Sequence, residues 1–233
     1  VTFTNKAAGE MKERINRLLR LSSNLKDSSI ENMPWVGTFH SICVKILKRY
    51  GENIGLNRNF TIYDSSDQKE AIKEAMKVLN ISVKEFNPGA IHSYISSAKN
   101  ELITPEEYNE FAQGYFQSIV AKVYPQYQKI LKENNALDFD DLLLLGVKLL
   151  KQNDAVLKYF TENFRYILVD EYQDTNHAQY TLIKMLASMH RNIYVVGDDD
   201  QSIYAFRGAN IRNILNFEKD YPEAKVVKLE QNY

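Results

Sequence analysis

The chain has 233 residues, of which 44% are hydrophobic, and it holds only nine glycines and five prolines. This length and composition suit one large domain or two small ones with proper cores. No apolar stretch approaches the ~18 residues of a membrane helix, and the first ten residues lack the charged-then-apolar order of a signal peptide. We therefore expect an intracellular, cytoplasmic protein with no membrane partner.

Charge and cysteine content bear on nucleic-acid binding, disulfides and structural metals. Lys and Arg number 29 against 30 Asp and Glu, so the formal net charge is −1 and bulk electrostatics gives no support to nucleic-acid binding. Any such site must be local. The single Cys43 cannot form an internal disulfide, and the four histidines have no cysteine partners at zinc spacing. We expect no structural metal.

Short runs of branched and aromatic residues near both ends of the chain are typical of buried β-strands. They cover residues 1–4, 35–39, 166–169, 193–196 and 226–229. Helical spacing follows the first two runs: Met11 and Ile15 continue with Leu18 and Leu19, and Ile42 pairs with Ile46. Strand and helix in alternation predict the α/β class, with a parallel, doubly wound sheet.

The middle of the chain is predicted to be helical. Apolar stripes at helical spacing recur between about residues 64 and 164, and strand signals vanish there. "TPEE" (104–107) has the capping Thr, the Pro and the Glu of a helix start, and "DFDDLLLLGVKLL" (138–150) predicts another helix with acids at its N-terminus. The simplest architecture is an α/β domain over 1–63 and 137–233, interrupted by a helical insertion at 64–136.

Polar residues follow three of the predicted strands, where open α/β sheets bind ligands. Asp170 and Glu171 follow the third run, Gly197 to Gln201 the fourth, and residues 230–233 the fifth. Asp170 would hold Mg²⁺ directly or through water, Glu171 would orient and deprotonate a water attacking a γ-phosphate, and the Gln201 amide would reach the same phosphate. An ordinary acidic strand end remains the alternative for the first pair; three converging ends favour a nucleotide site.

A second set of residues mixes aromatic rings with cations and small polar groups. Its members are Phe3, Thr4, Asn5, Lys6, Thr38, Phe39, His40, Tyr204, Phe206 and Arg207. Exposed rings stack on bases while polar and cationic groups hold phosphates, so the set suits single-stranded nucleic acid. Alternatives stay open for two members: Phe39 suits the core, and His40 alone suits a buried, hydrogen-bonded histidine.

Together these motifs resemble one family, the superfamily 1 DNA helicases of the UvrD, Rep and PcrA type. The matching segments are "VTFTNKAAGEM" (1–11), "GTFHSICVKIL" (37–47), "DFDDLL" (138–143), "VDEYQDTN" (169–176), "GDDDQSIYAFRGAN" (197–210) and "LEQNY" (229–233). They occur in the family's order from the first residue to the last, and the last three are highly specific.

The resemblance implies a partial RecA-like (P-loop NTPase) parallel sheet with a helical insertion that meets duplex DNA, and 3′→5′ translocation driven by ATP and Mg²⁺. Asp170 would be the Mg²⁺ ligand, Glu171 the catalytic base, Gln201 the γ-phosphate sensor and Tyr233 the ring that stacks on adenine. Phe3, Thr38, His40, Tyr204, Phe206 and Arg207 would line the single-strand path. Relatives often carry Trp at the position of Phe206, so we expect weaker stacking there.

One element of such a motor is missing from the sequence. No G-x-x-x-x-G-K-[ST] motif occurs, and no Gly is followed by Lys, so the phosphate cradle is absent. We expect an excised piece that also lacks the second motor domain, that hydrolyses no ATP alone, and that self-associates through a sheet edge left unpaired beside 193–196.

Two other readings compete with the motor fragment. The first is a non-catalytic module that binds single-stranded DNA or a protein partner; retention of Asp170, Glu171 and Gln201 argues against it, because a binder has no need of them. The second is the motor part of a helicase–nuclease, but we find no carboxylate–lysine cluster of a nuclease in the sequence.

Overall fold

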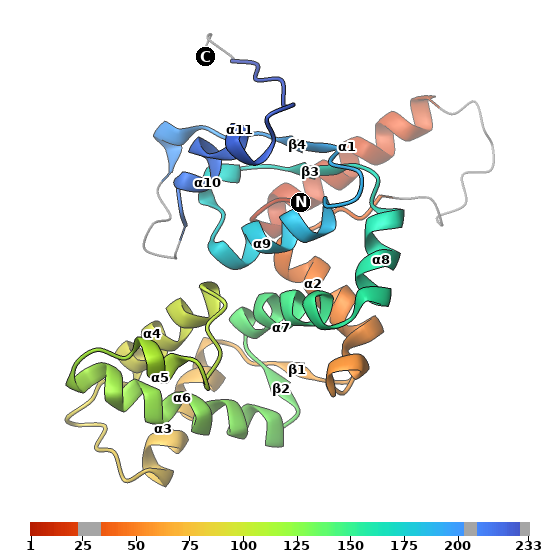
Figure 1. Ribbon diagram of the computed structural model, residues 1–233. Coiled ribbons are helices and arrows are strands. Elements are labelled where there is room, and N and C mark those ends of the chain that lie inside the picture. The colour runs from red at the N-terminus through yellow and green to blue at the C-terminus, as the bar shows by residue number, and fades with distance from the viewer. Residues whose placement is uncertain (23–33, 203–208, 229–233) are drawn as a thin grey trace.

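The computed structural model describes residues 1–22, 34–202 and 209–228, which form a helix-dominated fold with small parallel sheets. The first helices are α1 (Asn5–Ser22) and α2 (Phe39–Tyr50), followed by the short η2 (Gly51–Ile54). In Figure 1 the elements group into two bodies, one holding β3 and β4 and the other holding α3 to α6, with α7 between them. No helix in the described ranges is both long and apolar enough to cross a bilayer.

Two of the predicted strands are confirmed. They are β3 (Ile167–Val169) and β4 (Ile193–Val195), which run parallel with Val169 opposite Val195. A second small sheet pairs β1 (Thr61–Ile62) with β2 (Ala136–Leu137). The sequence reading missed these two-residue strands at the borders of the middle segment, because two residues are too few to show alternation.

The strands predicted at 1–4 and 35–39 are reduced to a single bridge between Thr2 and Thr38. Helices begin too soon for longer strands. The Thr4 hydroxyl accepts from the Ala7 N–H at 3.1 Å, and the Thr38 hydroxyl accepts from the Ser41 N–H at 3.2 Å. Both threonines therefore cap the helices that follow them, and the extended stretch ends at the cap.

The strand predicted at 226–229 is wrong where the structure describes it. Residues 226–228 belong to no strand, and residue 229 lies outside the described residues. The side chains of Val226 and Val227 are exposed. Branched residues favour a strand only where a neighbouring strand offers hydrogen bonds and packing, and no described strand pairs with this segment.

The middle segment forms α3 (Ser65–Val78), α4 (Pro88–Asn100), α5 (Tyr108–Phe111) and α6 (Tyr115–Glu133). At 104–107 the expected reciprocal bonds form, since the Thr104 N–H donates to Glu107 at 2.8 Å and the Glu107 N–H donates to Thr104 at 3.4 Å. The helix itself begins only at Tyr108 and lasts four residues. The cap therefore closes a turn rather than a full helix.

After the middle segment the chain continues through further helices. These are α7 (Phe139–Gln152), α8 (Asp154–Asn163), η3 (Tyr172–Asp174), α9 (His177–Leu186), η4 (Asp199–Gln201), α10 (Arg212–Leu215) and α11 (Phe217–Asp220). The helix predicted at 138–150 is confirmed as α7, with Asp138 as its cap. Its buried leucines pack in the cluster that also holds α2, α8 and α9.

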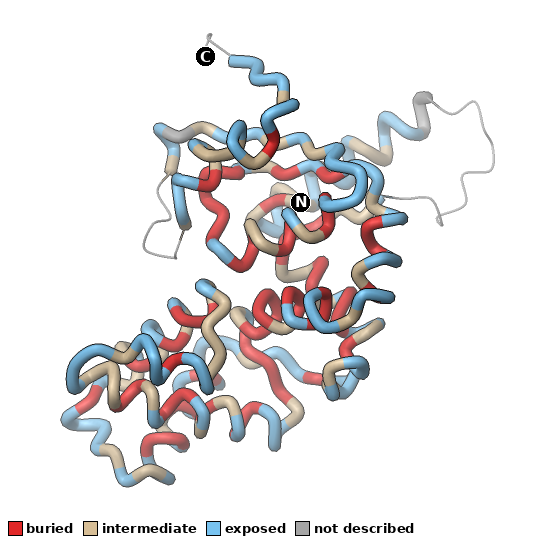
Figure 2. Tube along the Cα trace, in the orientation of Figure 1, coloured by how far each residue is buried: buried red, intermediate tan, exposed pale blue. Residues whose placement is uncertain are grey.

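Buried apolar side chains gather in two clusters. One unites α2, α7, α8, α9 and β3, and the other unites α3, α4 and α6. Figure 2 shows buried positions along α7 and α9 and along the helices of the second body. Each cluster is large enough to serve as a core for its own part of the chain.

A buried ionic network joins the two bodies. Lys99, in α4, places its Nζ 2.6 Å from Asp138 Oδ2 and 2.8 Å from Asp141 Oδ1, and all three side chains are at most 2% exposed. Tyr127 donates to Asp138 at 2.9 Å, and Gln128 donates to Asp141 at 2.9 Å. Helices α4 and α6 are thereby fixed to the start of α7.

This network makes stability depend on pH. Burial, together with the charge of Asp138, raises the pKa of Asp141 to about 7, against the opposing effect of Lys99. Between pH ~4 and ~7 the folded chain keeps a proton that the unfolded chain has released, so the contribution of Asp141 to the free energy of unfolding falls as pH rises, by up to about 1.4 kcal/mol per pH unit. Urea denaturation should show this decline in the unmodified chain and a weaker one in Asp141→Asn, where the raised pKa of the buried Asp140 still contributes. Equal pH profiles would contradict it.

Candidate active site and the adjoining pocket

The carboxyl ends of β3 and β4 lie side by side. The Val196 N–H donates to the Val169 carbonyl at 2.9 Å, and the Tyr172 N–H donates to the Val196 carbonyl at 2.9 Å. Asp170 and Glu171 therefore share one sheet edge with the Gly197 to Gln201 segment. The third predicted strand end does not join them, because its strand is not formed; its residues 230–233, including Tyr233, lie outside the described residues.

The start of the chain contributes to this edge instead. The Asp170 N–H donates to the Val1 carbonyl at 3.0 Å, so residues 1–2 lie along β3 on the side away from β4. The hydroxyl of the buried Thr2 donates to Asp170 Oδ2 at 3.3 Å. This contact holds the half-buried Asp170 carboxylate at the end of its strand.

Glu171 lies just beyond the strand with an exposed side chain. Its backbone has φ 52° and ψ 45°, a left-handed conformation that is costly for a residue other than glycine. Its Oε2 accepts a hydrogen bond from Gln173 Nε2 at 2.7 Å. The carboxylate is thus directed by its unusual backbone and by a neighbouring amide.

Gln201 ends the short η4 helix and connects to the same group. Its Nε2 donates to Asp198 Oδ2 at 2.6 Å. The Asp198 N–H in turn donates to Gln173 Oε1 at 3.1 Å. A continuous series of contacts therefore joins Glu171 and Gln201 through Gln173 and Asp198. The structure brings together the residues that the sequence placed in catalysis.

The chemistry of this edge suits a hard cation shared with a phosphate. Carboxylate oxygens of Asp170 and Asp198 are ligands that Mg²⁺ accepts, and Mg²⁺ is commonly bound by one or two carboxylates together with substrate phosphates. Within the described ranges no group of three or more His, Cys, Asp or Glu side chains is close enough to hold a metal by itself. Such a cation would need oxygens from the phosphate.

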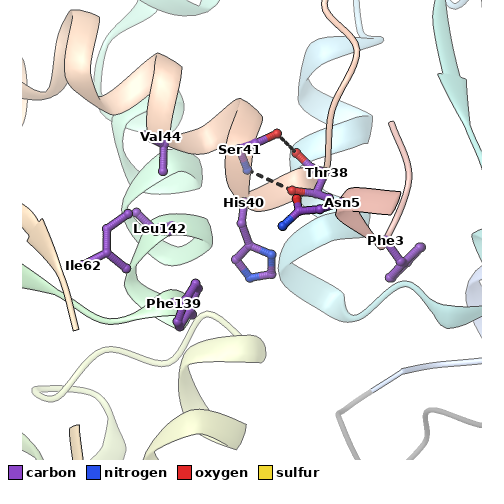
Figure 3. Close-up of a pocket in the computed structure, with 9 residues that line it drawn as sticks. All are labelled: Phe3, Asn5, Thr38, His40, Ser41, Val44, Ile62, Phe139 and Leu142. Carbon is purple, nitrogen blue, oxygen red and sulfur yellow. Dashed lines mark hydrogen bonds between the residues drawn. The ribbon is translucent and has the colours of Figure 1, made fainter. Parts of the chain in front are cut away.

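A pocket of about 290 Å³ lies beside this edge (Figure 3). Its lining residues are Phe3, Asn5, Thr38, His40, Ser41, Val44, Ile62, Phe139 and Leu142. It therefore collects four of the residues assigned to single-strand contacts, from segments held together by the Thr2 N–H, which donates to the Gly37 carbonyl at 3.1 Å. Helices α1 and α2 both begin at the pocket, where the positive ends of their dipoles favour an anion such as phosphate.

Other members of the predicted single-strand set lie differently. Thr4 caps α1, and Lys6 is exposed but outside the lining. Phe39 is only 2% exposed, which confirms the core alternative for this ring. Tyr204, Phe206 and Arg207 lie outside the described residues. Burial lowers the pKa of His40, which therefore contributes a neutral ring at pH 7.

The sequence reading missed Phe139 and Ser41 as lining residues. Phe139 is 47% exposed, although it begins an apolar helix. Its ring packs edge to face against that of His40, with 6.1 Å between the ring centroids. Phe139 could have been predicted as an exposed ring, because it is an aromatic residue at the first helical position and lies off the buried stripe of the helix. Figure 3 shows the His40 and Phe139 rings close together at the pocket.

Known proteins resemble this chain over its full length. It is 52% identical over all 233 residues to the ATP-dependent DNA helicase PcrA of Bacillus subtilis and to that of Staphylococcus aureus strain Mu50, and 51% identical to that of Staphylococcus epidermidis. It spans only 30% to 31% of the length of these relatives. The sequence profile of the UvrD/REP helicase N-terminal domain matches residues 1–222. The chain therefore belongs to the UvrD/REP helicase N-terminal domain family.

Proposed function

We propose that this chain is part of an ATP-dependent 3′→5′ DNA helicase, in which it supplies one side of the nucleotide site and part of the single-strand path. One observation carries the proposal. Two consecutive residues connect the sites, since Thr2 donates to Asp170 while Phe3 lines the pocket. A nucleotide that displaced the sheet edge would therefore also move Phe3 in the pocket that we assign to single-stranded DNA.

Within this motor, Asp170 would hold Mg²⁺ together with the nucleotide phosphates, Glu171 would take the proton of the attacking water, and Gln201 would contact the γ-phosphate. Mg²⁺ would neutralise charge on the phosphates. By the family resemblance, Tyr233 would be the ring that stacks on adenine. The parallel pair β3–β4, with polar residues beyond its carboxyl ends, supports a partial RecA-like sheet over 1–63 and 137–233, and the separate apolar cluster of α3, α4 and α6 supports a helical insertion over 64–136.

The chain alone does not hydrolyse ATP in this proposal, because phosphoryl transfer relies on a phosphate cradle and on charge neutralisation that its sequence lacks. The rival function is a non-catalytic module for single-stranded DNA or a protein partner. Such a module would not need the contacts that connect Glu171 to Gln201, so these contacts favour the motor.

We further propose that the chain associates with itself when separated from its motor partner domain. Tyr166, Leu168 and Tyr194 expose 58% to 75% of their surface on the β3–β4 sheet, and Leu18 of α1 is 62% exposed. Leu168 and Tyr194 lie opposite each other in the sheet, and exposed apolar side chains beside an unpaired sheet edge promote association. Light scattering should report species larger than one chain; a monodisperse monomer would contradict the proposal.

The pocket can be tested by fluorescence anisotropy with a labelled single-stranded oligonucleotide. Phe3→Leu/Phe139→Leu removes two rings and keeps apolar bulk. Each lost base stack costs about 1 kcal/mol or more, so Kd should rise at least about tenfold. Tyr166→Leu removes an exposed ring at the opposite end of β3 and serves as the control. Equal affinities for the double variant and the control would contradict the assignment.

A further inference from the structure

A buried glutamine connects the two loops of the β3–β4 edge. Gln173, in η3, has 0% of its surface exposed. Its Nε2 donates to Glu171 Oε2 at 2.7 Å, and its Oε1 accepts from the Asp198 main-chain N–H at 3.1 Å. One side-chain amide therefore joins the loop after β3 to the loop after β4.

The two neighbours fix the orientation of this amide. An ionised carboxylate can only accept a hydrogen bond, and a main-chain N–H can only donate one. The Gln173 amide satisfies both in a single orientation. A glutamate at this position would keep the acceptor and lose the donor, and a methionine of similar length would lose both.

The main chain after β4 is shaped around the same side chain. A Cβ on Gly197 would lie 2.6 Å from Gln173 Oε1 and 2.8 Å from Ile214 Cδ1, distances that real Cβ atoms essentially never show. A side chain at position 197 would have to displace the ends of Gln173 and Ile214, so glycine lets the backbone pass this close to the amide. On the other side, Glu171 holds a left-handed backbone that directs its carboxylate toward Gln173.

We propose that Gln173 is a positioning residue that sets the Glu171 carboxylate relative to Gln201. Asp198 provides the second half of the connection, because its carboxylate accepts from Gln201 Nε2 at 2.6 Å. A phosphate that displaced Gln201 would displace Asp198, and the Gln173 amide would transmit that displacement to Glu171. This inference rests on the proposed role of Glu171 as the base that activates water.

The connection itself can be tested in the chain without any catalysis. NMR hydrogen exchange of the Asp198 N–H should be slow in the unmodified chain and in Gln173→Glu, which keeps the acceptor. In Gln173→Met it should become about tenfold faster or more, because the acceptor is lost. Equal exchange rates in all three proteins would overturn the inference.

Its effect on catalysis can be tested in a chimera in which these 233 residues replace the matching segment of the Bacillus subtilis relative. Gln173→Glu and Gln173→Met should each lower kcat about tenfold to a hundredfold, with a much smaller change in the KM for ATP, because the base is misplaced rather than the nucleotide released. Gln68→Met is the control, since Gln68 is a buried glutamine in α3 that donates to the Tyr63 carbonyl, far from this edge in the chain.

The outcomes separate the two proposals. Unchanged kcat in both Gln173 variants, beside a strong loss in Glu171→Gln, would overturn the role of Gln173 alone. Hydrolysis that is insensitive to Glu171→Gln would overturn the proposed function, and the exchange rates would still decide whether Gln173 bridges the loops.

Discussion

Replacing Lys99 by methionine should lower the free energy of unfolding by about 3–5 kcal/mol. The change removes the cation that pairs with both Asp138 and Asp141, and it leaves two buried carboxylates with no other ion pair in the part of the chain that the structure describes. Because protonation relieves an uncompensated carboxylate, the loss should be smaller at pH 5 than at pH 8. Urea denaturation followed by circular dichroism measures both quantities.

A matched control lies on the surface of α3. Lys73 is 2.6 Å from Glu70, but both side chains are well exposed. Exposed pairs contribute little, so Lys73→Met should change stability by less than about 1 kcal/mol. Similar losses in the two variants would show that burial does not decide the strength of the Lys99 network.

Glu171→Gln should lower ATP hydrolysis by the chimera by about 10²- to 10⁴-fold at saturating single-stranded DNA. An amide of the same shape keeps the size of the side chain but accepts no proton from water. The KM for ATP should change far less, because the substitution removes a contribution to the transition state rather than to binding.

Glu162→Gln provides the comparison for this experiment. Glu162 lies in α8, is half-exposed, and forms only a 3.8 Å pair with Lys158. Its variant should hydrolyse ATP at the unmodified rate. A rate in Glu171→Gln close to that of Glu162→Gln would remove Glu171 from the catalytic step.

Local signals account for the parts of the fold that the sequence predicts well. The helix α7 follows from Asp138 and from the spacing of its leucines, all within a few residues of one another. The strands β3 and β4 follow from short apolar runs that end in acids. By contrast, the run 226–229 is also rich in branched residues, although it includes Lys228, and it forms no strand where it is described, because no described strand pairs with it.

The candidate site shows the same division. Asp170, Glu171 and Gln201 stand out as polar residues after strands, and the family resemblance assigns their roles. Gln173 gives no such signal, because the role that we propose for it depends on a hydrogen bond from Asp198, which is 25 positions away in the chain. Lys99 is likewise an ordinary helix residue until the fold brings Asp138, 39 positions away, to its Nζ.

We infer that the sheet edge and the pocket belong to one ATP-driven motor that single-stranded DNA stimulates. The most direct measurement is the ATP hydrolysis rate of the chimera as a function of single-stranded DNA concentration, with and without Phe3→Leu/Phe139→Leu. We expect DNA to accelerate hydrolysis, and we expect the double variant to need at least about tenfold more DNA for half of the maximal effect. Hydrolysis that ignores DNA, or the same DNA requirement in both proteins, would contradict it.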